Sequence, residues 1–439
     1  MRLKKQLKIM TAGVVLLVML WPAGSFAAYD YINISNPFLR KIPIAVPVFQ
    51  VAKDEDGTAD LAREAADLLA ETLAFTRYFK PINRDAFLEI PGEIGVTRED
   101  INCKNWRDIG ADFLVTGSVD RQEDELRFEL RLFDVIQERM VIGKRYQGDL
   151  DDQRKIVRRF CGEIMKSLTG SPGFFESSLA FISSGPGNKE VYTCEFDGYN
   201  PRRRTFNQVI DLSPAWSWDG RWLAYTSYQK GKPDLYIRHL DEEDRGAVVA
   251  RKGVNISPAW MPGSFALAAT LSFNGDQEIY LLSGSGKITR RLTRSWGIDV
   301  SPTFSPDGEK MAFVSNRAGS PQIYVKDLAS GKIQRLTFEG RYNTTPEWSP
   351  TGNRVAFSAL EDNQFNIKVV DVETREVIQL TRDQGDNESP TWSPDGSLIA
   401  FCTTREGGVP KIYVMTAFGT DQKRLLDLPG GQTSPAWSR

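Results

Sequence analysis

Hydrophobic and polar positions repeat with a fixed period over the C-terminal part of the chain. Six copies of a motif that reads Ser/Thr-Pro-x-Trp/Phe occur, with prolines at Pro214, Pro258, Pro302, Pro346, Pro390 and Pro435. Successive prolines are 44 residues apart in the first four steps and 45 residues apart in the last. A sequence period in this range indicates a solenoid, a propeller or an array of repeats.

Each period contains four short segments with the patterns of β-strands. The motif is the first segment, and a turn such as Ser305-Pro306-Asp307-Gly308 separates it from a second one such as Met311-Ala312-Phe313. An alternating segment such as Ile323-Tyr324-Val325 and a segment that ends in Leu336-Thr337 complete the period. Four short strands without helical periodicity between them fit a propeller blade, whereas a leucine-rich repeat would need half this period.

The repeat is incomplete at both of its ends. The last motif, Ser434-Pro435-Ala436-Trp437, has only the first strand of a blade, and the second-strand pattern at 179–183 has no motif before it. We therefore predict that the C-terminal strand completes the N-terminal blade. Six blades would then close into a ring that leaves no free sheet edge.

Residues 28–170 do not repeat and have the pattern of a small α/β domain. Strands are predicted over 42–49 and 113–117, and a hairpin over 126–133 and 140–146. Residues at helical spacing predict two helices, one that buries Leu61, Ala65, Leu68, Leu69 and Thr72 and one that buries Ile156, Phe160, Ile164 and Leu168. After a short linker, the all-β six-bladed propeller is predicted over 174–439.

Residues 1–27 have the pattern of a secretory signal peptide. A basic start, which contains Arg2, Lys4, Lys5 and Lys8, precedes an apolar segment over 9–20, and Ser25 and Ala27 place small residues before a cleavage site. The apolar segment is short for a membrane span, so an uncleaved anchor is the less favoured alternative. We expect an exported chain that is not inserted in a membrane after cleavage.

Composition and charge restrict the classes of partner. The chain has 439 residues, of which 41% are hydrophobic and 26% charged, as is typical of globular proteins. Lys and Arg number 55 against 57 Asp and Glu, which gives a net charge of −2. This near balance argues against nucleic acid as a partner, because binding to phosphates needs a positive excess. We expect a monomer.

Residues that could carry catalysis are scarce. The single histidine, His239, excludes sites that need two histidines, and no G-x-S-x-G nucleophile motif occurs. We expect a structural role for His239 at a strand end and no enzymatic activity. The four cysteines form no C-x-x-C pair, so no structural zinc is expected. Cys194 and Cys402 are expected to be buried free thiols, whereas a disulfide between Cys103 and Cys161 is left open.

One position of the repeat carries an amide or a carboxylate in all six copies. It lies three residues before the motif proline and is occupied by Asp211, Asn255, Asp299, Asn343, Asn387 and Gln432. In a propeller this position would lie near the channel mouth, where six oxygens could contact a ligand, a cation or a protein. Local hydrogen bonds to backbone groups are the alternative. We expect no cofactor, and no motif supports a channel-bound cation.

Apolar neighbours of this position favour a protein partner. The predicted partner-binding residues at the channel mouth are Ile210, Asp211, Leu212, Val254, Asn255, Ile256, Ile298, Asp299, Val300, Tyr342, Asn343, Thr344, Asn387, Glu388, Gln432 and Thr433. A second candidate is the polar-aromatic segment 28–40, in which Tyr29, Tyr31, Ile32 and Ile34 would dock on another protein. The alternative to this segment's docking role is a disordered tail.

The combination of a signal peptide, a small α/β domain and six S-P-x-W blades with split closure resembles the TolB family of the Tol–Pal system. The departures are Trp218 in place of the turn proline and Met261-Pro262-Gly263 in place of Ser-Pro-Asp-Gly. The resemblance implies a non-enzymatic periplasmic hub that binds the peptidoglycan-associated lipoprotein Pal at the channel face and TolA through the mature N-terminus. It also implies a role in outer-membrane integrity and cell division.

The remaining alternative is an exported peptidase or hydrolase whose propeller gates an active site. Such an enzyme needs a hydrolase domain with Ser, His and Asp, and residues 28–173 contain no histidine.

Overall fold

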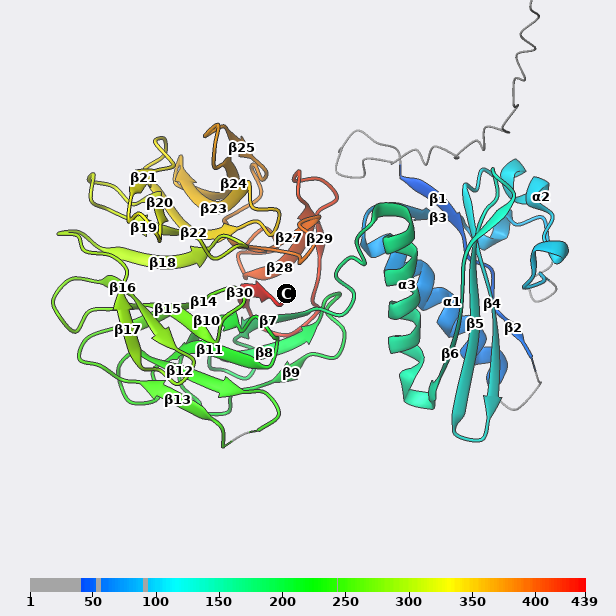
Figure 1. Ribbon diagram of the computed structural model, residues 1–439, viewed down its shortest axis with the longest axis horizontal. Coiled ribbons are helices and arrows are strands. Elements are labelled where there is room, and N and C mark those ends of the chain that lie inside the picture. The colour runs from blue at the N-terminus through cyan, green and yellow to red at the C-terminus, as the bar shows by residue number, and fades with distance from the viewer. Residues whose placement is uncertain (1–40, 53–56, 90–93, 243) are drawn as a thin grey trace, which may run out of the picture. The chain divides into compact units, whose positions relative to one another are not determined.

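The computed structural model describes residues 41–52, 57–89, 94–242 and 244–439. It contains one six-stranded sheet followed by six four-stranded sheets that are arranged as the blades of a propeller (Figure 1). The predicted fold class, a six-bladed propeller preceded by a small α/β domain, is confirmed.

The α/β domain is built on a mixed sheet with the strand order β3-β1-β4-β5-β6, and β2 also pairs with β4. Its strands are β1 (Ile42–Ala45), β2 (Gln50–Val51), β3 (Phe79–Pro81), β4 (Phe113–Gln122), β5 (Glu125–Asp134) and β6 (Arg139–Asp149). Its α-helices are α1 (Thr58–Phe75), α2 (Cys103–Asp108) and α3 (Gln153–Thr169). Three short 3₁₀ turns accompany them, η1 (Arg84–Ala86), η2 (Arg98–Asp100) and η3 (Leu150–Asp152).

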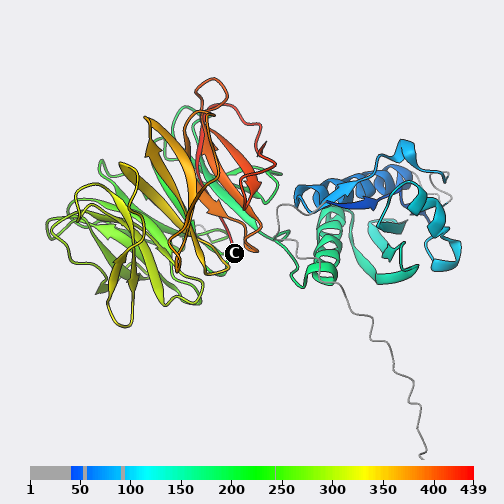
Figure 2. The ribbon, with the colours of Figure 1, turned by 90° about the horizontal axis from the view of Figure 1, so that it is seen from above.

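The two long helices of this domain pack on one face of its sheet and against each other (Figure 2). In α1 the predicted positions Ala65, Leu69 and Thr72 are buried, while Leu61 and Leu68 remain partly exposed. Helix α3 ends at Gly170, whose φ of 82° is the left-handed conformation that glycine adopts without a Cβ clash. The first strand is shorter than predicted and ends at Ala45; Pro47, which follows, has no N–H to donate to a ladder.

Each blade is an antiparallel sheet of four strands, which follow one another in sequence in blades 2 to 6. Blade 2 contains β10 (Asp211–Trp216), β11 (Trp222–Ser227), β12 (Asp234–His239) and β13 (Gly246–Val249). Blade 3 contains β14 (Asn255–Trp260), β15 (Ala266–Leu271), β16 (Glu278–Ser283) and β17 (Ile288–Arg291). Blade 4 contains β18 (Asp299–Phe304), β19 (Lys310–Ser315), β20 (Gln322–Asp327) and β21 (Ile333–Arg335).

Blade 5 contains β22 (Tyr342–Trp348), β23 (Arg354–Glu361), β24 (Gln364–Asp371) and β25 (Val377–Gln379). Blade 6 contains β26 (Asn387–Trp392), β27 (Leu398–Thr403), β28 (Lys411–Thr416) and β29 (Lys423–Arg424). Blade 1 combines the two ends of the repeat and contains β30 (Gln432–Trp437), β7 (Ser178–Ser183), β8 (Glu190–Glu195) and β9 (Arg202–Arg203).

The ring closes through this shared blade. Strand β30 pairs antiparallel with β7, so the last strand of the chain completes the first blade, as the incomplete repeats predict. The buried Trp437 donates its indole N–H to the hydroxyl of Ser177 at 2.8 Å. The backbone N–H of Ser178 donates to the hydroxyl of Ser438, also at 2.8 Å. Closure therefore rests on side chains as well as on the strand ladder.

The Ser/Thr-Pro pair of each motif forms a β-bulge in the first strand. In blade 2 the register shifts between Leu212 and Ala215, so two residues lie opposite one on β11. The residue before each motif proline has a positive φ of 47–54° in all six copies. A bulge leaves one residue outside the ladder, which explains why a proline without an N–H is tolerated there.

Indole groups also link neighbouring blades. Trp260 donates its N–H to the carbonyl oxygen of Ala215 at 3.2 Å, and Trp392 donates to that of Glu347 at 3.1 Å. Trp216 makes the equivalent bond to Ala436 across the closure, at 3.0 Å. The aromatic residue of the motif therefore packs between blades. Trp348 donates instead to the carbonyl oxygen of Gly352 in its own blade, and Phe304 has no N–H to donate.

Candidate functional site: the channel and its loop face

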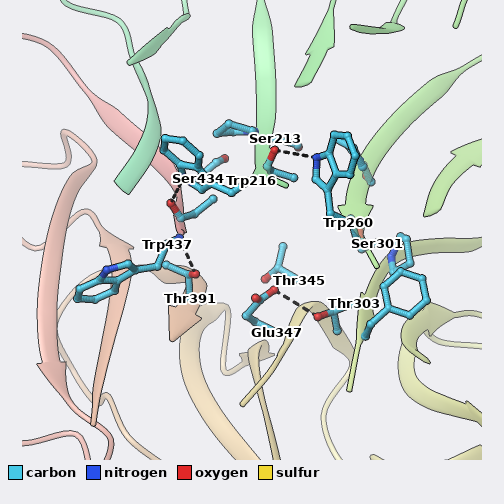
Figure 3. Close-up of a pocket in the computed structure, with 18 of the residues that line it drawn as sticks. Ser213, Trp216, Trp260, Ser301, Thr303, Thr345, Glu347, Thr391, Ser434 and Trp437 are labelled. Carbon is cyan, nitrogen blue, oxygen red and sulfur yellow. Dashed lines mark hydrogen bonds between the residues drawn. The ribbon is translucent and has the colours of Figure 1, made fainter. Parts of the chain in front are cut away.

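The first strands of the six blades surround a central cavity of about 220 Å³ (Figure 3). Its wall includes the Ser/Thr-Pro pairs of all six blades together with Glu347 and Arg439. The bulges turn these pairs toward the lumen, so the repeated motif itself forms the lining. The lining is mixed, because hydroxyl groups of the motif alternate with proline, alanine and aromatic side chains.

Glu347 is the acidic group of this lining. The Thr303 hydroxyl lies 3.5 Å from one of its carboxylate oxygens (Figure 3). Burial raises the pKa of Glu347 to about 7, an effect that the charge of Arg439 and the bond from Thr303 partly oppose. This carboxyl group thus changes its charge near neutral pH, inside the channel.

The six repeated amides and carboxylates are not exposed at the mouth. Asp211, Asn255, Asp299, Asn387 and Gln432 have no exposed surface, and Asn343 is 1% exposed. The predicted ring of accessible oxygens is therefore wrong, and the alternative of local hydrogen bonding is what the structure shows. A partner cannot contact these side chains unless the loops open.

These side chains form hydrogen bonds to the backbone of the loop that precedes the first strand. The Asn343 amide donates to the carbonyl oxygen of Glu339 at 2.8 Å, and the Asn255 amide donates to that of Arg251 at 2.9 Å. Gln432 makes the equivalent bond to Leu428 at 3.2 Å. In each case the acceptor lies four residues earlier in the chain, so one repeated position shapes the same loop in different blades.

The two aspartates of this ring are paired within the fold. Arg317 donates to both carboxylate oxygens of Asp299, at 2.8 and 3.1 Å. Asn207 donates to both oxygens of Asp211 at 3.2 Å. Burial raises the pKa of both carboxyl groups, and hydrogen bonds from these partners oppose the rise.

Two sets of loops form one face of the propeller, which we call the channel face. One set leads into the first strand of each blade, and the other joins the second and third strands. The two sets touch, because the N–H of Asp211 donates to the carbonyl oxygen of Lys189 and that of Asn343 to Pro321. The loops of the ring therefore form a continuous surface.

The apolar residues predicted on this face differ in exposure. Ile210, Ile298 and Tyr342 are 45%, 42% and 40% exposed. The other predicted residues of this face, both apolar and polar, are partly buried; they are Leu212, Val254, Ile256, Val300, Thr344, Glu388 and Thr433. Val300 also packs against the buried cluster of blades 4 and 5, so it supports the core in addition to bordering the channel.

Three exposed aromatic residues of the channel face were missed by the sequence analysis. Trp296 is 77% exposed, Phe206 70% and Phe338 57%. Each lies in a loop that leads into a first strand, a few residues before the repeated amide or carboxylate. Phe206 and Phe338 lie at the same position of the repeat, five residues before Asp211 and Asn343, but the other four blades carry no aromatic residue there, and Trp296 has no aromatic counterpart. No pattern common to all six repeats therefore indicated these side chains. Large exposed apolar side chains gathered on one surface are typical of interaction sites.

The other chemical candidates have structural roles. His239 accepts hydrogen bonds at Nδ1 from the N–H groups of Glu242 (3.1 Å) and Asp241 (3.3 Å), as expected for a strand-end histidine. All four cysteines are buried free thiols, so Cys103 and Cys161 form no disulfide. Over the described ranges, no three His, Cys, Asp or Glu side chains group together so as to hold a metal.

Two sequence predictions fall outside the part of the chain that the structure describes. They are the signal peptide over 1–27 and the docking segment with Tyr29, Tyr31, Ile32 and Ile34. Within the described ranges, none of the helices combines the length and the hydrophobicity needed to cross a bilayer.

Together, these features define a class of protein, a closed six-bladed propeller that presents an apolar loop face and follows a small α/β domain. The chain belongs to the TolB family. The family model described as the TolB beta propeller domain matches residues 165–439, and the TolB amino-terminal domain matches residues 30–141.

Individual relatives agree with this assignment. The Tol-Pal system protein TolB of Desulfosudis oleivorans is 64% identical over 238 residues, which is 54% of each chain. That of Syntrophus aciditrophicus is 37% identical over 211 residues, 47% of each chain. The chain thus spans about half the length of the curated relatives it matches. The crystal structure of TolB from Acinetobacter baumannii superposes with a TM-score of 0.79 at 26% identity and covers 91% of this chain and 97% of its own.

Proposed function

We propose that this protein is a periplasmic, non-enzymatic interaction hub of the Tol–Pal system, and that its channel face binds the lipoprotein Pal. Membership of the TolB family supports the system, and the exposed side chains of the channel face support a protein as the partner. The single observation that carries the proposal is the gathering of Trp296, Ile298 and Tyr342 on neighbouring loops of one face. Apolar anchors with polar residues around them are the usual anatomy of a protein interface.

The second part of the proposal concerns the N-terminal segment, which would bind TolA. Two separate sites would let one molecule connect two partners and so support outer-membrane integrity and cell division. The function requires no cofactor and no catalytic group. His239 supports the absence of a catalytic group, because its Nδ1 accepts hydrogen bonds from two backbone N–H groups of its own loop and so has a structural role.

Titration of the mature protein with soluble Pal and with soluble TolA tests both parts. Removal of residues 28–34 is expected to abolish TolA binding and to leave Pal binding within about twofold. Val254→Glu is expected to weaken Pal binding by about 2 kcal/mol, the scale of an interface hot spot, and to leave TolA binding unchanged. Loss of neither interaction in these folded variants would refute the assignment of the two sites.

A pull-down from solubilised envelopes provides an independent check, because it does not presuppose the partners. Recovery of Pal and TolA with the intact protein is the expected result. Recovery of neither would contradict the proposed function.

A further inference from the structure

Charged side chains are unevenly distributed around the channel face. Five exposed cations lie in the loops from blade 1 to the entry of blade 4; they are Lys189, Lys230, Arg251, Lys252 and Arg294. We call these five residues the basic arc. Within the described chain none of them forms an ion pair, and Asp276 is the exposed carboxylate among them.

The other half of the ring carries mainly carboxylates. Glu339, Asp362 and Asp383 are exposed, and Asp386 is partly exposed, in the loops from the entry of blade 5 to the entry of blade 6. We call these four residues the acidic arc. Arg341 and Arg382 lie among them and reduce but do not cancel the negative charge.

Further charges of these loops are already engaged within the fold. The internal pairs are Lys232 with Asp234, Arg317 with Asp299, Lys368 with Glu361, and Arg424 with Glu406 and Asp427. Arg405 donates to Gln422 and lies over the ring of Tyr413, and Lys411 donates to backbone carbonyls. The two arcs, together with Asp276, Arg341 and Arg382 among them, are therefore the exposed charges that these loops offer a partner.

The repeated architecture creates a problem of orientation that these arcs can solve. The first strand of every blade has the same bulge, and the loop before it is held in a similar way. The shape of the backbone alone therefore gives little preference for one of the six rotational positions that a bound protein could take. A positive half and a negative half remove this degeneracy, because opposite charges attract and like charges repel over the whole face. Electrostatic complementarity of this kind guides encounter and fixes register more than it adds affinity.

We propose that the channel face holds its protein partner in one rotational register, with the basic arc against an acidic surface of the partner and the acidic arc against a basic surface. This inference rests on the proposed function and specifies the partner's chemistry, a folded domain with a dipolar contact surface. An anionic membrane or a nucleic acid fits the face less well. Such a uniform polyanion would be repelled by the acidic arc and would leave the exposed aromatics without apolar contacts.

Association kinetics with soluble Pal as the probe test the electrostatic part. K230E/R251E/K252E is expected to slow association about tenfold at low salt, and the effect should largely vanish at about 0.5 M salt, where screening is strong. The matched control K287E/R290E/K332E reverses three exposed cations outside the channel face and should change the rate less than about twofold. Equal slowing in both variants would overturn the proposal.

A variant with weakened polarity separates the arrangement of charge from its total. K230E/K252E/D362K/D383K keeps the net charge of the wild type but lowers the charge of the basic arc from +5 to +1 and brings that of the acidic arc from −4 to 0. Slow association is expected to persist in this variant. Recovery of the wild-type rate would show that only net charge matters and would overturn the proposal.

Cross-linking tests the single register directly. A thiol-directed cross-linker on K230C, in a chain whose four native thiols are buried, should connect to one acidic segment of Pal. The same linker on D383C should connect to a different, basic segment. Attachment of both positions to the same set of Pal segments would show several registers and overturn the proposal.

The outcomes also separate this inference from the function on which it depends. Absence of Pal binding to the wild type would refute the proposed function. Normal Pal binding with unchanged kinetics in both arc variants would refute only the fixed register. Binding of the wild type to phosphatidylglycerol vesicles that is lost in K230E/R251E/K252E would assign the basic arc to lipid and overturn the inference.

Discussion

Two neighbouring sets of residues on the channel face differ in every property that bears on function. The amides and carboxylates at the start of the first strands have similar chemistry in all six blades, and they are buried and hydrogen-bonded. The residues of the loops before them differ from blade to blade, and several are exposed, namely Ile210, Ile298 and Tyr342, with Trp296 at 77% as the extreme. Repetition therefore marks what every blade needs in order to form, while recognition of one partner lies where the repeats differ.

The largest expected effect comes from the architecture that the repeats share. Deletion of Ser434–Arg439 removes all but the first two residues of β30 and most of its pairing with β7, and it exposes an edge of blade 1 that is otherwise closed. We expect a loss of more than about 5 kcal/mol in the free energy of unfolding, which is the range of exceptional single lesions. Thermal unfolding followed by circular dichroism measures it. A truncated protein that melts like the full chain would show that closure is unimportant.

Substitutions at two adjacent residues, Asp299 and Ile298, compare the buried ring with the exposed loop directly. Asp299→Leu removes the carboxylate that pairs with Arg317 and should cost about 2–3 kcal/mol, as for a buried hydrogen bond to a charged group. Ile298→Ser alters the exposed residue next to it and should change stability by less than about 0.5 kcal/mol. Urea denaturation of both variants gives the two values. Equal losses in the free energy of unfolding would contradict the distinction between buried ring residues and exposed loop residues.

Glu347 of the channel lining should make the free energy of unfolding depend on pH. The folded pKa of Glu347 is raised from its ordinary value of 4.5 to about 7. Its contribution is therefore fully present below about pH 4.5 and is lost as the pH rises through about 7. Glu347→Gln should gain about 1–2 kcal/mol relative to the wild type between pH 5 and pH 8, measured by denaturation at both values. A difference that does not vary with pH would contradict the burial of this carboxyl group.

Much of the fold could be predicted because the repeat encodes it directly. The spacing of the prolines gives the number of blades, and the lone motif around Trp437 gives the closure. The left-handed conformation of Ser213 and its equivalents could not be predicted, because serine rarely adopts a positive φ and its bulge depends on the paired strand. The first strand ends early, at Ala45, because Pro47 has no N–H to donate to the ladder. The prediction followed the hydrophobic pattern over 42–49 and gave this proline too little weight.

The candidate site was predicted only in part, for a related reason. Sequence alone located the loops, and Ile210, Ile298 and Tyr342 are exposed there. Sequence alone could not distinguish a side chain that points to solvent from one that points back to its own loop. For this reason the predicted exposure of Asn343 and its equivalents was wrong. Exposure of Trp296 was equally hidden, because tryptophans at the motif position are mostly buried and no repeat period applies to a unique residue.

The central claim is that exposed, non-repeated loop residues bind the partner while the repeated channel residues support the fold. Calorimetric titration of soluble Pal into folded Trp296→Ala and Glu347→Gln variants tests it most directly. We predict that Trp296→Ala weakens the Kd by about 30-fold, equivalent to about 2 kcal/mol, and that Glu347→Gln leaves it within about twofold. An unchanged Kd in Trp296→Ala together with a weakened Kd in Glu347→Gln would contradict the claim and place the binding site in the channel.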